Sequence, residues 1–224
     1  MNPLIVVTGG TKGIGKAVVE RFVSEGFDAV ICARHVEGAE GPNRFPVAAD
    51  LATREGINTL VAFTQRLNRP VDVLVNNTGL FFPGQIHTEE EGVLEQTMAV
   101  NVYSAYHLTR GLIGEMITRR KGHIFMMCST ASIVAYTNGG SYCISKYALL
   151  GMSRVLREEM KPHNVKVTAI LPGATLTASW EGVDLPEERF MKPEDVAETL
   201  WTAYNLSERA VVEEILMRPQ LGDL

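Results

Sequence analysis

The sequence predicts an α/β domain in which helices cover both faces of a parallel β-sheet. Short β-branched runs alternate with segments whose apolar residues recur at helical spacing. Glycine and polar clusters follow the expected strands, which is where α/β sheets bind ligands. The 224 residues are 46% hydrophobic and 21% charged, an ordinary composition for one folded domain. We therefore expect one domain, 1–224, with a doubly wound sheet of about seven strands.

The first half of the chain alternates strands with helices. Residues 4–8 form a β-branched run that ends in glycines, which indicates a strand buried on both faces. A helix is expected at 13–26, a second strand at 29–33 and a weaker third strand at 45–49. The amphipathic pattern of 53–68 predicts the next helix.

The second half repeats this alternation up to the C-terminus. Strands are expected at 71–75, 122–128, 165–171 and 211–217, and helices at 89–120, 141–161 and 193–206. Residues 89–120 read as two helices or one long bent helix. Pro193 is suited to the first turn of its helix.

Composition argues against several classes of partner. The net charge is −5 and no basic run stands out, so we expect no nucleic acid partner. No apolar run approaches the roughly 18–20 residues of a membrane span, and the N-terminus lacks a basic signal region. The three cysteines and five histidines have no metal-site spacing. A cytoplasmic protein without a metal is expected.

Two patterns carry chemistry. Glycines from Gly9 to Gly15 join the first strand to the first helix, where backbone N–H groups can approach a pyrophosphate. The alternative is a glycine-rich turn without a ligand. Tyr142 and Lys146 lie four residues apart and therefore on one helix face. A cation beside a phenol lowers the pKa of the phenol, which suits proton transfer to a carbonyl. The alternative is a solvated lysine beside a packed tyrosine.

These and further motifs resemble the classical short-chain dehydrogenase/reductase family over about residues 4–180. The motifs occur in the family's order: Thr8 to Gly15, Asn76-Asn77-Thr78-Gly79, Asn101, Ser129, Tyr142 with Lys146, and Pro172-Gly173. Ser129 precedes Tyr142 by thirteen residues, as the family's catalytic serine does. The resemblance implies a Rossmann-type fold that binds NAD(P).

The resemblance also implies catalytic roles within 101–146. Tyr142 would be the general acid/base, and Lys146 would lower its pKa and bind the nicotinamide ribose. Ser129 would position the substrate oxygen, and Asn101 would hold a water in a proton relay. Ser129 could instead only bond backbone, with Ser132 as a rival, and Asn101 could be a helix-kink or cap residue.

The implied cofactor contacts fall mainly within 4–101 and continue beyond the catalytic pair. Asp50 is either an adenine contact or a helix N-cap, or both. A short segment, about 174–192, would cover the substrate. The full set is Gly9, Thr11, Lys12, Gly13, Ile14, Gly15, Arg34, Asp50, Leu51, Asn77, Gly79, Tyr142, Lys146, Pro172, Gly173, Thr175 and Thr177.

The end of the second strand indicates which dinucleotide is used. NAD-preferring enzymes usually carry an acid there, whereas this chain has Ala33 followed by Arg34. Arg34 and Lys12 could flank a 2′-phosphate, which predicts NADP(H) rather than NAD(H). The alternative is that both are solvated charges. Only ten residues separate Arg34 from Phe45, too few for the family's usual helix, so the adenine side is expected to be open.

Together these patterns predict an NADP(H)-dependent oxidoreductase that interconverts a small carbonyl compound and a secondary alcohol. The alternatives are a 3-oxoacyl-thioester or pteridine-type reductase, or a non-catalytic NADP-binding sensor or scaffold. Helices 89–120 and 141–161 are apolar on more than one side, which predicts a homodimer or homotetramer. The sequence leaves open the substrate and the direction of reaction.

Overall fold

A computed structural model describes residues 1–180 and 182–224, so residue 181 of the expected segment 174–192 lies outside the described residues. The strands are β1 Leu4–Thr8, β2 Asp28–Ala33, β3 Arg44–Ala48, β4 Val73–Asn76, β5 Gly122–Met127, β6 Val165–Pro172 and β7 Glu214–Met217. The α-helices are α1 Gly13–Ser24, α2 Arg54–Arg66, α3 Val93–Met98, α4 Ser104–Arg119, α5 Gly140–Met160 and α6 Pro193–Tyr204.

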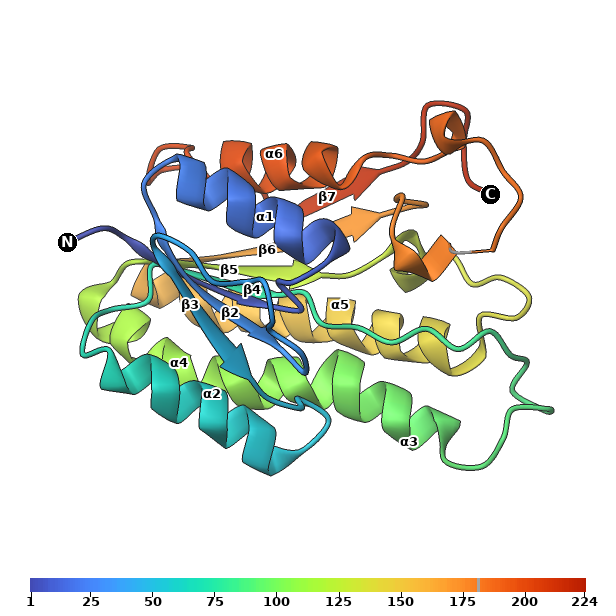
Figure 1. Cartoon of the computed structure of the whole chain (residues 1–224), viewed down its shortest axis with the longest axis horizontal. Coiled ribbons are helices and arrows are strands. Elements are labelled where there is room, and N and C mark those ends of the chain that lie inside the picture. Colours follow the sequence, from blue (N-terminus) through green and yellow to red (C-terminus); the bar gives the residue numbers. More distant parts are fainter. Residues whose placement is uncertain (181) are drawn as a thin grey trace.

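The seven strands form one parallel sheet in the order β3-β2-β1-β4-β5-β6-β7 (Figure 1). The expected doubly wound α/β fold is confirmed. The strand order reverses direction between β1 and β4, whose residues Ile5 and Val73 pair. Ligands of such sheets bind beyond the carboxyl ends of the strands at this reversal.

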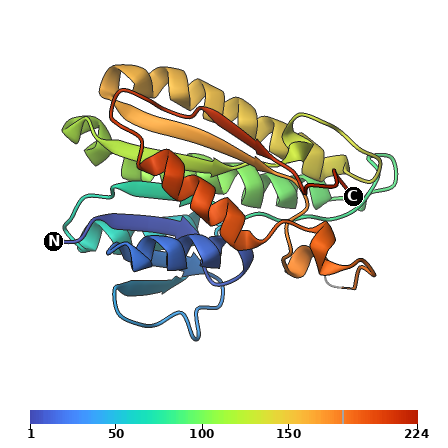
Figure 2. The same ribbon diagram turned by 90° about the horizontal axis from the view of Figure 1, so that it is seen from above.

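Helices cover both faces of the sheet: α1 and α6 lie on one side and α2, α4 and α5 on the other (Figures 1 and 2). Neighbouring residues of β1 serve opposite cores, because side chains alternate along a strand. Val6 packs among residues of the α2–α4–α5 side and Val7 among those of the α1–α6 side. Both are fully buried, which explains the continuous β-branched run.

Several boundaries differ from the expectation. The segment 89–120 starts its helix only at Val93, and a π-helical turn, Ala99–Tyr103, joins α3 to α4. β7 begins at Glu214 rather than at residue 211. Thr53, not Asp50, caps α2, because its hydroxyl accepts the Gly56 N–H at 3.0 Å. The segment after Arg34 forms turns without a helix, as its length predicted.

Candidate active site

The glycine turn after β1 is packed backbone against backbone. Gly9 has φ +65° and donates its N–H to the Cys32 carbonyl at 2.8 Å. A Cβ placed on Gly15 would lie 2.2 Å from the Gly9 carbonyl oxygen and 2.6 Å from the Asn77 amide nitrogen. Only glycine fits there, and this close approach brings the start of α1 onto the turn.

The start of α1 fits an anionic group. The Lys12 side chain is exposed and makes no capping hydrogen bond to α1 among the described residues. The first N–H groups of a helix have no partner within the helix, and its dipole favours negative charge. The first turn of α1 carries no acidic residue. The diphosphate of a dinucleotide therefore fits this position, between Thr11 and Gly15.

Side chains at the end of β4 bind the end of β1. The Thr8 hydroxyl accepts the N–H groups of Asn77 and Thr78 at 2.8 and 2.9 Å. The Asn77 amide donates to the Thr8 carbonyl at 2.8 Å and to the Gly9 carbonyl at 3.3 Å. Asn77 thus holds the strand reversal together beside the glycine turn. Thr8 begins the predicted glycine motif but was not among the predicted site residues.

Asn101 fastens the loop after β4 from within the π-helical turn. Its Oδ1 accepts the Leu80 N–H at 2.7 Å, and its Nδ2 donates to the Leu80 carbonyl at 3.0 Å. Nδ2 also donates to the Ser145 hydroxyl at 2.8 Å. Asn101 is 1% exposed and lies in the π-helical turn between α3 and α4. Its amide joins this turn to the loop after β4 and to α5. Ser145 is a further participant that no sequence pattern indicated.

Lys146 is a buried cation at the carboxyl edge of the sheet. Its side chain is held by the Met127 carbonyl, to which Nζ donates at 2.7 Å, and the residue is 5% exposed. Nζ lies 5.7 Å from the ring centroid of Tyr142. A Cβ placed on Gly79 would lie 3.7 Å from this Nζ and 3.6 Å from Asn101 Oδ1. The fold therefore gathers Gly79, Asn101, Tyr142 and Lys146.

Ser129 and Ser132 both bond backbone in the turn after β5. Ser129 Oγ accepts the Ala131 N–H at 3.1 Å, and Ser132 Oγ accepts the Ser129 N–H at 3.1 Å. Ser132 is 1% exposed and Ser129 is 9% exposed. The Ser129 hydroxyl retains its own proton for a further acceptor, so the capping bond does not remove it as a donor.

Asp50, Leu51 and Arg34 are three further residues that the sequence predicts as cofactor contacts. Asp50 is exposed and accepts the Ala52 N–H at 3.0 Å, while Leu51 is buried. Arg34 is exposed and, like Lys12, forms no ion pair with the residues that the structure describes.

The chain after β6 returns to the glycine turn. Gly173, which follows Pro172, donates its N–H to the Met217 carbonyl at 2.8 Å, and Thr175 is 4% exposed. A Cβ on Gly13 would lie 3.0 Å from Thr177 Cγ2. Residues 172–177 therefore run from the end of β6 to the start of α1.

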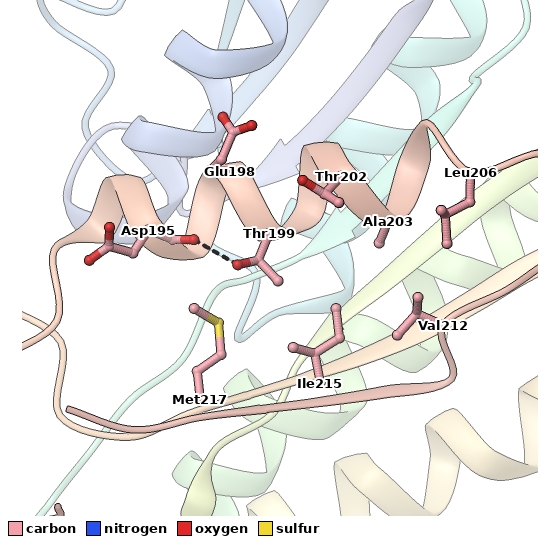
Figure 3. A pocket seen from close by; sticks show the side chains of 9 residues that line it. All are labelled: Asp195, Glu198, Thr199, Thr202, Ala203, Leu206, Val212, Ile215 and Met217. Carbon is pink, nitrogen blue, oxygen red and sulfur yellow. Dashed lines mark hydrogen bonds between the residues drawn. The ribbon is translucent and has the colours of Figure 1, made fainter. Parts of the chain in front are cut away.

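Two other features lie apart from this site. A cavity of about 350 Å³ separates α6 from β7 (Figure 3), and none of the predicted site residues lines it. His123 is buried, and burial followed by the charge of Lys166 lowers its pKa to about 3, so it is a neutral core histidine. Within residues 1–180 and 182–224, no group of three His, Cys, Asp or Glu side chains could hold a metal.

Fold and site together define a dinucleotide-binding type of α/β domain with a tyrosine–lysine pair at the carboxyl edge of its sheet. The family described as short chain dehydrogenase matches residues 3–187. The sepiapterin reductase of Chlorobaculum tepidum is 31% identical over 100% of this chain and 99% of its own length. An NAD-dependent glycerol dehydrogenase of Listeria innocua is 31% identical over 88% of this chain and 84% of its own.

Solved structures agree. A metagenomic short-chain oxidoreductase in complex with NADP matches with a TM-score of 0.84 and 29% identity, over 97% of each chain. The chain belongs to the short-chain dehydrogenase/reductase family. It is an oxidoreductase acting on CH–OH and C=O groups. None of its described helices is long and apolar enough to cross a membrane.

Proposed function

We propose that the chain is an NADP(H)-dependent oxidoreductase that interconverts a carbonyl and a secondary alcohol, with Tyr142 as general acid/base. The observation that carries this proposal is the buried Lys146 ammonium. It lies 5.7 Å from the Tyr142 ring centroid, at the edge of the sheet where such folds bind dinucleotides. Burying a cation costs free energy unless other groups pair with it.

The residues divide the work of reduction as follows. When bound, the dinucleotide supplies the hydride that adds to the carbonyl carbon. The Tyr142 hydroxyl gives its proton to the carbonyl oxygen, and the Ser129 hydroxyl donates a hydrogen bond to the same oxygen. Two donors placed in advance stabilise the charge that develops there. The products are the alcohol and the oxidised dinucleotide, and oxidation reverses each step.

Lys146 and Asn101 support that proton transfer. The Lys146 ammonium has three N–H donors, of which Met127 takes one at 2.7 Å. The others serve the nicotinamide ribose and the Tyr142 hydroxyl. Asn101 keeps the loop after β4 in place and holds a water in the proton relay to Lys146.

Charge at the end of β2 supports NADP(H). Ala33 ends the strand without a carboxylate, and Arg34 and Lys12 are both exposed. The family includes both preferences, since the glycerol dehydrogenase above is named NAD-dependent and the metagenomic oxidoreductase binds NADP. We assign the remaining contacts from Gly9 to Gly15, at Asp50 and Leu51, at Asn77 and Gly79, and at 172–177 to the same dinucleotide.

Tyr142→Phe tests the assignment of the acid. The phenylalanine ring can still pack, so NADPH affinity should stay within about twofold while carbonyl reduction falls by at least the ~100-fold typical of a lost general acid. Lys146→Met should weaken both. Absorbance at the NADPH band follows turnover, and fluorescence titration follows binding. Reduction by Tyr142→Phe at the wild-type rate would show that another group is the acid.

A pteridine-type reductase is a second candidate. It is favoured by the sepiapterin reductase of C. tepidum, which matches this chain over its whole length. Turnover of sepiapterin with NADPH, compared with simple ketones, separates the two candidates.

We also propose a homo-oligomer. Leu108, Leu112 and Leu149, expected among the surplus apolar residues, lie in the core instead. Tyr106 on α4 and Tyr147 on α5 remain 44% and 46% exposed, and both are large enough to anchor a contact between copies. Light scattering at micromolar concentration should give a multiple of the 24.6 kDa chain mass; a monomer would refute this.

A further inference from the structure

Two loops beside Tyr142 are joined to each other. Residues 80–92 follow β4, and residues 133–139 precede α5. Gly84 donates its N–H to the Asn138 carbonyl at 3.0 Å, and the Gln85 side chain donates to Asn138 Oδ1 at 3.0 Å. Gly84 and Gly139 also form a short parallel β-bridge. The two loops therefore behave as one wall.

Glu89 fixes this wall to the helix that carries Tyr142. Its Oε1 accepts the Ser141 N–H at 2.9 Å, and its Oε2 accepts the Ser141 hydroxyl. A Cβ on Gly140 would lie 1.9 Å from Oε1, and one on Gly84 would lie 2.7 Å from Glu89 Cγ. The two glycines thus make room for a carboxylate at the positive end of α5.

The wall presents aromatic rings to Tyr142. The Phe81 ring meets the Tyr142 ring edge to face, with centroids 4.9 Å apart and planes at 73°. Tyr136 lies against the start of α5, since a Cβ placed on Gly139 would lie 3.3 Å from Tyr136 Cε2. Phe81 and Tyr136 are still 40% and 47% exposed, which leaves ring surface for a ligand.

The wall carries no positive charge. Residues 80–92 and 133–139 contain no lysine or arginine and one histidine, His87, whereas Glu89, Glu90 and Glu91 follow each other in the first loop. A carboxylate or phosphate on the substrate would therefore meet the apolar rings of this wall without a lysine or arginine of the wall to pair with. Burying an unpaired charge against such a surface is strongly unfavourable.

Resting on the function proposed above, we propose that the substrate is an uncharged carbonyl compound with an aromatic ring next to the carbonyl carbon. The carbonyl oxygen faces the Tyr142 and Ser129 hydroxyls, and the ring packs against Phe81 and Tyr136. Rings meeting edge to face or offset gain energy beyond their buried area. The Glu89 bond keeps Phe81 in position for this contact.

Three α-keto compounds test the charge and the ring separately. Ethyl benzoylformate is neutral and aromatic, benzoylformate is the corresponding carboxylate anion, and ethyl pyruvate lacks the ring. With NADPH, kcat/KM for ethyl benzoylformate should exceed that for benzoylformate by about 100-fold and that for ethyl pyruvate by about tenfold. Equal or higher values for either comparison compound would overturn the proposal.

Phe81→Ala and Phe82→Ala form a matched pair of variants, since Phe82 is similarly exposed at 37% and makes no aromatic contact among the described residues. Phe81→Ala should lower kcat/KM for ethyl benzoylformate about tenfold more than it lowers kcat/KM for ethyl pyruvate. Phe82→Ala should change neither. Equal losses in the two variants would contradict the role of Phe81.

Calorimetric binding separates this inference from the proposed function. With NADP⁺ and the Tyr142→Phe variant, in which the alcohol is not oxidised, ethyl mandelate should bind at least about tenfold more tightly than mandelate. Binding of the ester without turnover of any carbonyl would refute the function and retain the ligand class. Turnover without preference for a neutral aryl compound would refute the ligand class and retain the function. Failure of the ester to bind would overturn the inference.

Discussion

The loop after β4 and the loop after β2 border the same candidate site but are built differently. After β4, side-chain amides bind backbone across the chain: Asn77 holds the Thr8 carbonyl and Asn101 holds both polar groups of Leu80. After β2, the connection to β3 is made by turns, with positive φ at Gly38, Gly41 and Asn43. Arg34 and most of its neighbours are exposed.

The loop after β4 therefore fixes the geometry of the candidate site, whereas the loop after β2 contributes positive charge. The β4 side can hold reacting groups in position before a ligand arrives, because the Asn77 and Asn101 amides already bind backbone there. The β2 side offers exposed cations on a shortened connection, so it can select a dinucleotide by charge without holding it rigidly. Substitutions on the β4 side should therefore affect folding, whereas those on the β2 side should affect only affinity.

The largest effect is expected where the glycine turn meets Asn77. In Gly15→Ala, the new Cβ would lie 2.2 Å from the Gly9 oxygen, and overpacking of this kind costs about 1–3 kcal/mol or more. Gly114→Ala on α4 is the control, because a Cβ there meets nothing within 4 Å. Urea unfolding should show Gly15→Ala destabilised and Gly114→Ala unchanged or more stable. Equal stabilities would mean that the turn is not tightly packed.

Arg34→Ala should lower the affinity for NADPH without changing the stability of the fold. A hydrogen bond to a charged group contributes roughly 1.5–3 kcal/mol, so NADPH affinity should fall by roughly ten- to a hundredfold. Affinity for NADH should change little, and so should the urea midpoint. Fluorescence titration measures both dinucleotides. Equal wild-type affinities for NADPH and NADH would indicate that the shortened connection has reshaped the adenine side.

A smaller effect is expected for Glu89→Gln. The amide keeps an acceptor but loses the charge that favours the start of α5, which should cost about 1 kcal/mol in the free energy of unfolding. Glu90→Gln is the control, since it removes the charge of the residue next to Glu89 and leaves the bond between Glu89 and Ser141 intact. Urea unfolding compares the two variants. A loss in Glu90→Gln as large as that in Glu89→Gln would show that net charge, rather than the bond to Ser141, matters.

Local patterns were sufficient for most of the fold. Strands such as 4–8 could be predicted because both of their faces are buried, which requires a continuous apolar run. Tyr142 and Lys146 could be paired because helical spacing is regular. Asp50 was the predicted candidate for the cap of α2, but Thr53 caps the helix instead.

Contacts between distant segments could not be predicted in the same way. Glu89 and Ser141 are 52 residues apart, and no periodicity links a carboxylate to a helix start at that separation. Asn101 reaches Leu80 from a π-helical turn, which has no reliable sequence signature. The contacts of the β4 side thus required the tertiary structure, although the candidate catalytic residues could be named from the sequence.

Transfer of a labelled hydride tests whether the chain reduces a carbonyl with Tyr142 as general acid. NADPH carrying deuterium at the transferred position is incubated with ethyl benzoylformate and either the wild type or Tyr142→Phe, and the alcohol is analysed by mass spectrometry. We expect one deuterium on the carbinol carbon with the wild type and little product with Tyr142→Phe. Unlabelled alcohol, or labelled alcohol formed equally fast by Tyr142→Phe, would contradict this expectation.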